Sequence, residues 1–312
     1  MKVWIDTDPG IDDALAIMLA LKSPELQVVG ISAVHGNIEV ELGASNVLKI
    51  LSLLGSDVPV WVGAPRNLIG DLRTAPFIHG KDGLGDLLKA PGRRPESGSA
   101  FGALARALRE AEEPITVIAL GPLTNVALAL AHEPDIERNF ERIVVMGGAF
   151  RCEGNTTPAA EFNVYCDPEA ARFVLRSGIP QVWVGLDVTM RTVMPLEWSE
   201  KLARCKDEGL RFIGELTTFY SRYYRSYYGI EGCALHDPLT VGYLLNSKLV
   251  TTREVFVDVE LGGMLCRGRT VADMWGIPEP WGEPNAEVAL DVDARAFLKL
   301  FRERVLREED RT

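Results

Sequence analysis

The sequence predicts an α/β fold with a mostly parallel central sheet, flanked by helices on both faces in the manner of a Rossmann-like open sheet. Short apolar runs rich in β-branched residues alternate with helical patterns from Val3 to Gly185. Apolar strands separated by helices are typical of βαβ units. The length of 312 residues and the 47% hydrophobic content allow a large buried core, and no repeat or clear linker divides the chain. We therefore expect a single domain over residues 1–312.

The first half contains the alternating elements. An apolar stripe at helical spacing marks Val40–Leu54 as a helix that covers the sheet. The predicted helices are Asp12–Leu21, Val40–Leu54, Ala100–Glu110, Leu123–Ala131 and Pro168–Arg176. The predicted strands are Val3–Asp6, Val28–Val34, Val58–Val62, Ile115–Leu120, Ile143–Met146 and Gln181–Gly185.

In the second half of the chain, the regular alternation of short strands and helices gives way to a different pattern. A helical stretch at Glu197–Tyr228 carries a dense group of aromatic residues. The remaining predicted elements are a helix beginning near Asp237, strands at Glu254–Glu260 and Glu287–Val292, and a closing helix at Ala294–Leu306. Two Gly- and Pro-rich loops, Leu68–Gly98 and Trp275–Pro284, are long enough to be binding loops or lids.

Charge and cysteine usage exclude several classes of protein. The 44 acidic and 33 basic side chains leave a net charge of −11, which argues against a nucleic-acid or anionic-membrane partner. No apolar run approaches the roughly 18 residues of a membrane helix, and the chain runs from Met1 straight into a strand, which leaves no room for a signal peptide. The five cysteines form no C-x-x-C pair. These features favour a reduced, cytoplasmic protein.

Four carboxylates lie directly after or near the end of the first predicted strand, at Asp6, Asp8, Asp12 and Asp13. N-capping and the helix dipole account for one or two of them. They do not account for two more at the strand end, where four like charges raise one another's pKa values. A hard divalent cation would offset these charges, and oxygen ligands favour Ca²⁺ or Mg²⁺. We therefore expect a metal site at the carboxyl end of the sheet, where ligands bind in such folds.

Five further polar segments end strands or lie in loops. They are His35–Asn37, Ile78–Gly85, Leu120–Asn125, Met146–Asn163 and Leu235–Pro238. Taken singly, each has an ordinary structural interpretation, such as a turn, a solvated loop histidine, or a helix corner capped by Thr124 or Asn125. Near the end of the fourth segment, however, Asn155, Glu161 and Asn163 alternate with apolar residues. Amides and a carboxylate that converge there would suit vicinal hydroxyls, which both donate and accept hydrogen bonds.

Together these segments resemble the inosine–uridine-preferring nucleoside hydrolase family. The matching motifs are D-x-D-P-G-x-D-D from Asp6, I-H-G-x-x-G-L from Ile78, G-P-L-T-N from Gly121, G-N-x-T-P-x-A-E-F-N from Gly154 and H-D-P from His236. They occur in the family's order and cover most of the chain. The D-x-D pattern alone also occurs in haloacid-dehalogenase-type phosphatases, but those usually continue D-G-T, and the joint appearance of the other motifs excludes that assignment.

The resemblance implies Ca²⁺-dependent hydrolysis of the N-glycosidic bond of ribonucleosides, giving ribose and a free base. The metal ligands would be Asp8, Asp13, Asp237 and the backbone carbonyl of Leu120. Asp8 would also be the catalytic general base, Asp6 would orient the ligands, and His236 would be the catalytic proton donor to a purine leaving group. The implied substrate-binding residues are Asp12, Asn37, His79, Met146, Asn155, Glu161, Phe162, Asn163, Tyr224 and Tyr228.

Base preference depends on tyrosines that recur every four residues, Tyr220, Tyr224 and Tyr228, and so share one helical face. Packing in the core or between subunits is the ordinary interpretation, and a wall that stacks on the base beside His236 is the functional one. Pyrimidine-preferring members are similar here but carry Thr and Gln where Tyr220 and Tyr224 align. This departure favours a non-specific inosine/uridine enzyme. The alternatives are a pyrimidine-preferring hydrolase and a non-catalytic nucleoside or sugar sensor. The resemblance also implies a homodimer or homotetramer that serves nucleoside salvage or catabolism.

Overall fold

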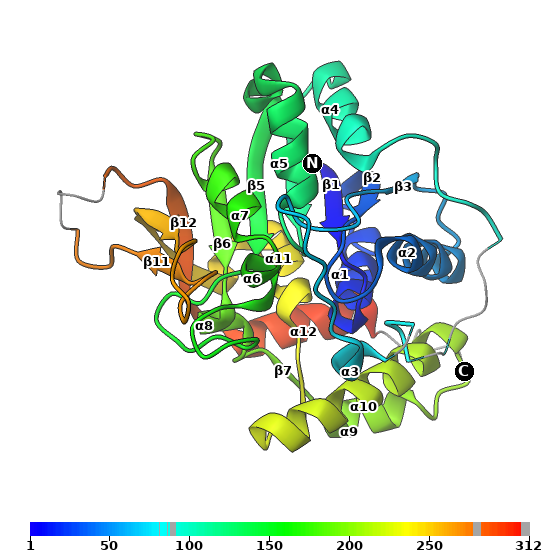
Figure 1. The fold of residues 1–312 in the computed structure, drawn as a ribbon. Coiled ribbons are helices and arrows are strands. Elements are labelled where there is room, and N and C mark those ends of the chain that lie inside the picture. Colours follow the sequence, from blue (N-terminus) through cyan, green and yellow to red (C-terminus); the bar gives the residue numbers. More distant parts are fainter. Residues whose placement is uncertain (81, 86, 88–91, 277–281, 307–312) are drawn as a thin grey trace.

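The computed structural model describes residues 1–80, 82–85, 87, 92–276 and 282–306 (Figure 1). An eight-stranded sheet forms its centre. The order across the sheet is β3 (Val60–Val62), β2 (Gln27–Ala33), β1 (Lys2–Thr7), β4 (Ile115–Ala119), β5 (Phe140–Met146), β6 (Gln181–Val184), β12 (Ala286–Val292) and β9 (Val250–Val255). The strands predicted in the first half all form, with ends shifted by a few residues.

The strand directions confirm the predicted open, mostly parallel sheet. Neighbours pair in parallel from β3 to β12, and the edge strand β9 runs antiparallel to β12. The order β3-β2-β1-β4-β5-β6 is that of a doubly wound sheet, in which the strand order reverses between β1 and β4. Ligands in such sheets bind outside the carboxyl ends of the strands at this switch point.

Helices cover both faces of the sheet, because consecutive strand residues point in opposite directions. Ile118 and Val144 belong to one buried apolar cluster, and their neighbours Val117 and Ile143 belong to the other. The first cluster includes residues of α1 (Ile11–Leu21), α2 (Val40–Leu54), α11 (His236–Leu245) and α12 (Ala294–Val305). The second includes residues of α4 (Ala100–Glu110), α5 (Thr124–His132) and α7 (Pro168–Leu175). Figure 1 shows α4 and α5 on the side of the sheet away from α12.

The prediction of one helical stretch over Glu197–Tyr228 is wrong, because two helices form there. α9 (Leu196–Leu202) ends before a turn, and α10 (Glu208–Tyr228) begins with Asp207 as its N-cap. The Asp207 carboxylate accepts a hydrogen bond from the Leu210 backbone N–H over 2.8 Å. A side chain that satisfies a free N–H group starts a new helix, and periodicity alone does not reveal the break.

The predicted strand Glu254–Glu260 also divides into two. β9 ends at Val255 and pairs with β12, whereas β10 (Val257–Val259) pairs with β11 (Thr270–Ala272) in a separate small sheet. The side chain of Asn285 bonds to both the N–H and the carbonyl of Val257, and the Phe256 carbonyl accepts from Asp273. These contacts turn the chain out of the central sheet.

The other short elements had no prediction. They are α3 (Pro76–His79), α6 (Phe162–Cys166), α8 (Leu186–Thr189), β7 (Val193–Pro195), β8 (Gly232–Ala234) and the 3-10 turns Pro134–Asn139 and Ser247–Leu249. Helix α3 lies inside the predicted loop Leu68–Gly98. Residues 81, 86 and 88–91 of this loop, and residues 277–281 of the predicted loop Trp275–Pro284, lie outside the described residues.

Candidate active site

The turn between β1 and α1 places carboxylates at the switch point of the sheet. α1 begins at Ile11, with Gly10 as its N-cap. The Gly10 backbone N–H donates to Asp13 Oδ2 over 3.0 Å, and the Thr7 hydroxyl donates to Asp13 Oδ1. Asp13 therefore caps its own helix, as acidic residues in a first turn often do. The same two hydrogen bonds fix the orientation of the Asp13 carboxylate at the end of β1.

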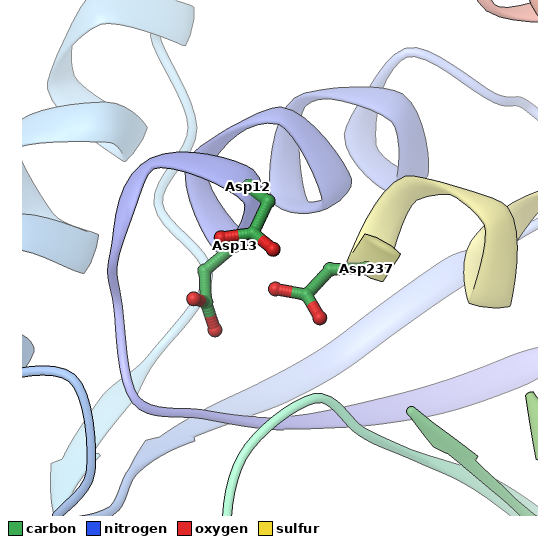
Figure 2. Close-up of side chains that lie close together, drawn as sticks. All are labelled: Asp12, Asp13 and Asp237. Atoms are coloured by element: carbon green, nitrogen blue, oxygen red, sulfur yellow. The ribbon is translucent and has the colours of Figure 1, made fainter. Parts of the chain in front are cut away.

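Asp12, Asp13 and Asp237 converge at this edge (Figure 2). One carboxylate oxygen of each lies within 4.8 Å of the others, and all three residues are buried. Burial raises the pKa of Asp12 and Asp237 well above the usual range, and the neighbouring negative charges raise it further. Among the ion pairs of the described residues, none includes these carboxylates. The cluster is thus one that a cation would stabilise.

Asp8 lies beside this group but outside the close triplet. Its Oδ2 accepts the Asn37 backbone N–H over 2.7 Å, while its Oδ1 is buried with no hydrogen-bond partner among the described residues. A Cβ atom at Gly121 would come within 2.7 Å of that Oδ1, so the glycine is required for the chain to pass this close. Burial and the charge of Asp13 raise the pKa of Asp8. A buried carboxylate oxygen without a donor is unfavourable unless an ion or water supplies the missing contact.

Asp6 faces the neighbouring strand and helix. Its Oδ1 accepts from the Ser32 hydroxyl on β2 and from Asn125 Nδ2 on α5, the latter over 2.8 Å. Burial raises the pKa of Asp6 to about 7, although these hydrogen bonds oppose the shift. The Asp6 backbone carbonyl also accepts the N–H of Leu120 over 2.7 Å. Asp6 therefore joins the ends of β1, β2 and β4.

The prediction that Thr124 or Asn125 caps α5 is wrong. The N-cap is Leu123, with no side-chain cap bond. Asn125 instead bonds to the Ala33 carbonyl and accepts from the Ala64 N–H, and the Thr124 hydroxyl donates to Asp167. Buried backbone groups at strand ends need partners, and Asn125 supplies them, whereas Thr124 bonds to the side chain of Asp167.

The next two strands bring backbone carbonyls to the same edge. The Leu120 carbonyl, just after β4, accepts from Asn163 Nδ2 over 2.6 Å. The same amide nitrogen lies 3.1 Å from the carbonyl of Met146 at the end of β5. All three residues line one cavity. The structure therefore brings the Leu120 carbonyl to the site, with Asn163 as its hydrogen-bond partner.

The loop before α6 is held together by its own polar side chains. Glu161 is the N-cap of α6 and accepts backbone N–H bonds from Gly148, Asn163 and Val164 at 2.8–3.1 Å. Asn155 Oδ1 accepts the Phe162 N–H over 2.9 Å. Burial raises the pKa of Glu161, and its backbone hydrogen bonds oppose the shift. The loop thus has a fixed shape, and Asn155, Glu161 and Phe162 line the cavity.

Asn37 and His79 border the carboxylates. Asn37 Nδ2 donates to Asp13 Oδ2 over 3.2 Å. His79 Nδ1 accepts the Ile11 backbone N–H over 3.1 Å, so the hydrogen of the neutral ring is on Nε2. Burial lowers the pKa of His79 to about 3, which keeps the ring neutral. His79 can therefore donate from Nε2 to a ligand.

The tyrosines of α10 form the opposite wall. Tyr220 and Tyr224 are buried, and their rings meet edge to face at 5.0 Å. The Tyr224 hydroxyl lies 2.5 Å from His236 Nε2, and the Tyr228 ring lies 5.5 Å from that of Tyr224. Burial lowers the pKa of His236 to about 4. Tyr220 and Tyr224 thus fit both interpretations, since they pack in the core and also line the cavity, whereas Tyr228 lines the cavity but is exposed.

These walls enclose a cavity of about 680 Å³, within the range of small-molecule sites. It contains all ten predicted substrate-binding residues together with Leu120, His236 and Asp237, whereas Asp6, Asp8 and Asp13 are not part of its surface. Sequence reasoning missed Arg73 and Tyr165 in its lining, where the Arg73 guanidinium stacks 4.3 Å above the Tyr165 ring. It also missed Tyr223 and Tyr227, which the spacing of tyrosines on α10 could have indicated, and Thr189, which contacts His236.

The two sides of the cavity suit different chemistry. Carboxylates and amides on one side match a polyhydroxylated sugar, and the tyrosines with the buried His236 on the other match a planar heteroaromatic ring. A doubly wound sheet with this site at its switch point defines an α/β enzyme that acts on a small glycoside. Residues 3–299 match the family of inosine-uridine preferring nucleoside hydrolases. The chain belongs to this family.

Individual relatives agree with this assignment. The chain is 44% identical over 308 residues to the pyrimidine-specific ribonucleoside hydrolase RihA of Citrobacter koseri, with 98% of each chain covered. It is similar in structure to the purine-preferring ribonucleoside hydrolase from Gardnerella vaginalis, with a TM-score of 0.92, 34% identity and 98% of each chain covered. A plant nucleoside hydrolase gives a TM-score of 0.91 and 37% identity over 97% of this chain and 98% of that one.

The comparisons confirm the predicted family, fold and enzyme class, which is a hydrolase acting on N-glycosyl compounds. Within the described ranges, every helix is too short or too polar to span a bilayer.

Proposed function

We propose that this enzyme hydrolyses the N-glycosidic bond of both purine and pyrimidine ribonucleosides in a Ca²⁺-dependent reaction, releasing ribose and free base. The observation that carries the proposal is the cavity itself. Its carboxylate and amide side faces a tyrosine wall that contains His236, so the sugar and the base of one nucleoside would each meet complementary groups. The bond to be broken would lie between the two sides.

Asp8, Asp13, Asp237 and the Leu120 carbonyl would hold the metal. Three observations support a hard cation: the donors are all oxygens, the carboxylates lack cationic partners among the described residues, and Asp8 Oδ1 is buried without a donor. Asp12 also lies close to Asp13 and Asp237, and we assign it to the ribose, since it lines the cavity and Asp13 does not. When bound, Ca²⁺ would offset the carboxylate charge and supply Lewis acidity toward hydroxyls and water.

Asp8 would act as the general base toward the attacking water. The Asn37 N–H holds one of its oxygens and leaves the other free of protein donors among the described residues. A carboxylate oxygen with no other donor can accept a proton from the attacking water. Asp12, Asn155, Glu161 and Asn163 would hold the ribose as it becomes oxocarbenium-like, as in glycoside hydrolysis generally.

His236 would serve the leaving base from the tyrosine wall. Its Nε2 meets the Tyr224 hydroxyl, so the two residues present one connected hydrogen-bonding group to the cavity. A purine leaving group gains most from this help, because the departing base must be stabilised by a proton or hydrogen bond. His79 would donate to the base from the side of the carboxylates.

A second candidate is a pyrimidine-specific hydrolase, which the name of the 44% identical relative favours. The contact of Tyr224 with His236 favours the broader range that includes inosine.

The test is a reducing-sugar assay with inosine, uridine, adenosine and cytidine, with and without EDTA. We expect ribose from inosine and uridine, loss of release with EDTA, and recovery on addition of Ca²⁺. Release from uridine and cytidine alone would select the pyrimidine-specific enzyme. Nucleoside binding without ribose release would select the non-catalytic sensor.

We further propose that the protein works in the cytoplasm as a homodimer or homotetramer. The acidic composition and the lack of paired cysteine motifs support the location. Light scattering coupled to size-exclusion chromatography measures the assembly, and a monomeric mass would contradict it.

A further inference from the structure

His236 is held between two hydroxyl groups. Its Nε2 lies 2.5 Å from the hydroxyl of Tyr224, which lines the cavity. Its Nδ1 lies 2.7 Å from Oγ1 of Thr189, a fully buried residue at the end of α8. The backbone of Thr189 is fixed in turn, because its N–H donates to the Gly185 carbonyl and its carbonyl accepts from the Thr192 N–H and hydroxyl. Thr189 thus presents its hydroxyl to Nδ1 from a rigid position.

The hydrogens of this arrangement can be counted. Across the described ranges, the Thr189 hydroxyl makes its hydrogen bond to His236 Nδ1 and to no other group. If Nδ1 carried a hydrogen and donated it to Thr189, the threonine's own hydroxyl hydrogen would be buried without an acceptor. A buried hydroxyl hydrogen without an acceptor loses its hydrogen bond to water and gains none in return. This is unfavourable and rare in proteins. If Thr189 donates instead, Nδ1 is an acceptor and the ring hydrogen lies on Nε2.

We propose that Thr189 is a positioning residue that fixes His236 as the Nε2–H tautomer. The Nε2–H then donates to the Tyr224 oxygen, and the Tyr224 hydroxyl keeps its own hydrogen for an acceptor in the cavity. The hydrogen bonds run in one direction, from Thr189 through His236 and Tyr224 toward the leaving base. In such a chain each bond polarises the next, and the final donor stabilises negative charge that develops on the base. The catalytic role of this hydrogen-bond chain rests on the proposed function, whereas the assignment of the His236 tautomer does not.

The tautomer is measured directly by long-range ¹⁵N–¹H correlation spectra of the histidine side chains. The chain has four histidines, so a His236→Gln variant identifies the resonances of His236. We expect the Nε2–H tautomer in the wild-type protein and in Thr189→Ser, which keeps the hydroxyl. The wild-type spectrum shows which ring nitrogen of His236 carries the hydrogen, even if a Thr189 variant does not fold. An Nδ1–H tautomer in the wild-type protein would overturn the inference.

Kinetics supply the second readout. Thr189→Val replaces the hydroxyl with a methyl group of similar size and removes the donor to Nδ1. We expect kcat on inosine to fall by at least about tenfold, a part of the ~10²–10⁴-fold typical of a positioned proton donor. Hydrolysis of 4-nitrophenyl riboside should change less than about twofold, because its leaving group is a stable anion, and Thr189→Ser should retain most activity on both. Equal losses on the two substrates in Thr189→Val, or unchanged inosine hydrolysis, would overturn the inference.

If the wild-type protein releases no ribose from any nucleoside, the proposed function fails, while the spectra still decide the tautomer of His236.

Discussion

At the scale of single residues, the site is built from polar side chains whose positions are set by neighbouring backbone groups. Glu161 accepts three backbone N–H bonds, and Asp13 accepts one from Gly10 and a second bond from the Thr7 hydroxyl. Such bonds hold carboxylates in place before a substrate arrives, so little reorganisation is needed during the reaction. Asp8 differs, because one of its oxygens is held and the other has no partner among the described residues.

This difference gives a prediction for Asp8. Asp8→Asn has nearly the same shape but cannot accept a proton from water. We expect kcat to fall by at least ~100-fold on inosine and uridine alike, in line with the loss of a general base. Initial rates of ribose release measure the effect, and calorimetric titration with Ca²⁺ shows whether the metal still binds. Activity within tenfold of wild type, with the metal bound, would contradict the assignment.

The prediction for His236 concerns the leaving group. His236→Ala removes the partner of Tyr224 and with it the donor chain to the base. We expect a larger loss on inosine than on uridine, and the smallest loss on 4-nitrophenyl riboside. The ratio of kcat/KM values for the three substrates is the measurement. If all three fell by the same factor, His236 would not be acting on the leaving base.

At the scale of elements, helix α10 determines the tyrosine wall, and its position depends on close packing against α9. Gly214 on α10 lies against the C-terminal end of α9, because a Cβ atom there would overlap the backbone nitrogen of Ala203, the C-cap of α9. Backbone atoms cannot move aside as a flexible side chain can. The glycine is therefore needed for the approach of the two helices and for the placement of Tyr220 and Tyr224.

Gly214→Ala tests this packing. The gain of about 1 kcal/mol in helix propensity opposes an overpacking cost of about 1–3 kcal/mol, and the overlap with backbone puts the cost at the upper end. We expect a net loss of about 1–2 kcal/mol in the free energy of unfolding, measured by chemical denaturation. The matched control is Gly209→Ala in the first turn of α10, where a Cβ would meet only Asp207 Oδ1 at 3.3 Å. Similar stability changes in both variants would show that the α9–α10 contact is not the cause.

At the scale of the whole molecule, the fold gathers negative charge at one edge of the sheet. Part of the excess of 44 acidic over 33 basic residues lies in this buried cluster rather than on the surface. The protein stability should therefore respond to a cation that binds the folded state. The unfolded chain has no such cluster, since Asp237 is far from Asp12 and Asp13 in the sequence.

We expect Ca²⁺ to raise the melting temperature, and EDTA to reverse the effect. At a Ca²⁺ concentration 100 times Kd the stabilisation is about 2.7 kcal/mol, which corresponds to roughly 4 °C for a chain of this size. Differential scanning fluorimetry measures the shift. Asp237→Asn should abolish it, whereas Asp12→Asn, assigned to the ribose, should retain it. A shift that survives in Asp237→Asn but disappears in Asp12→Asn would reverse the two assignments.

Much of this molecule could be predicted from local sequence. The βα alternation predicts the parallel sheet, because burial on both faces requires near-continuous apolar strands such as Ile115–Ala119. The clustered aspartates predict a cation site, because their proximity along the chain makes their repulsion unavoidable. The joint motifs from Asp6 to Pro238 indicate the family, which the comparison over residues 3–299 confirms.

Long-range packing decided the rest. The break between α9 and α10 is an exception, because it comes from the local Asp207 cap, which periodicity does not reveal. The change of sheet at Phe256 and the use of Asn125 to join strand ends depend on partners distant in the sequence. The same holds for the convergence of Asp237 with Asp12 and Asp13, and for the contact of Thr189 with His236. Periodicity and motifs report interactions within a few residues of one another. Which distant polar groups satisfy each other is set only when the strand order and the helix contacts bring them together.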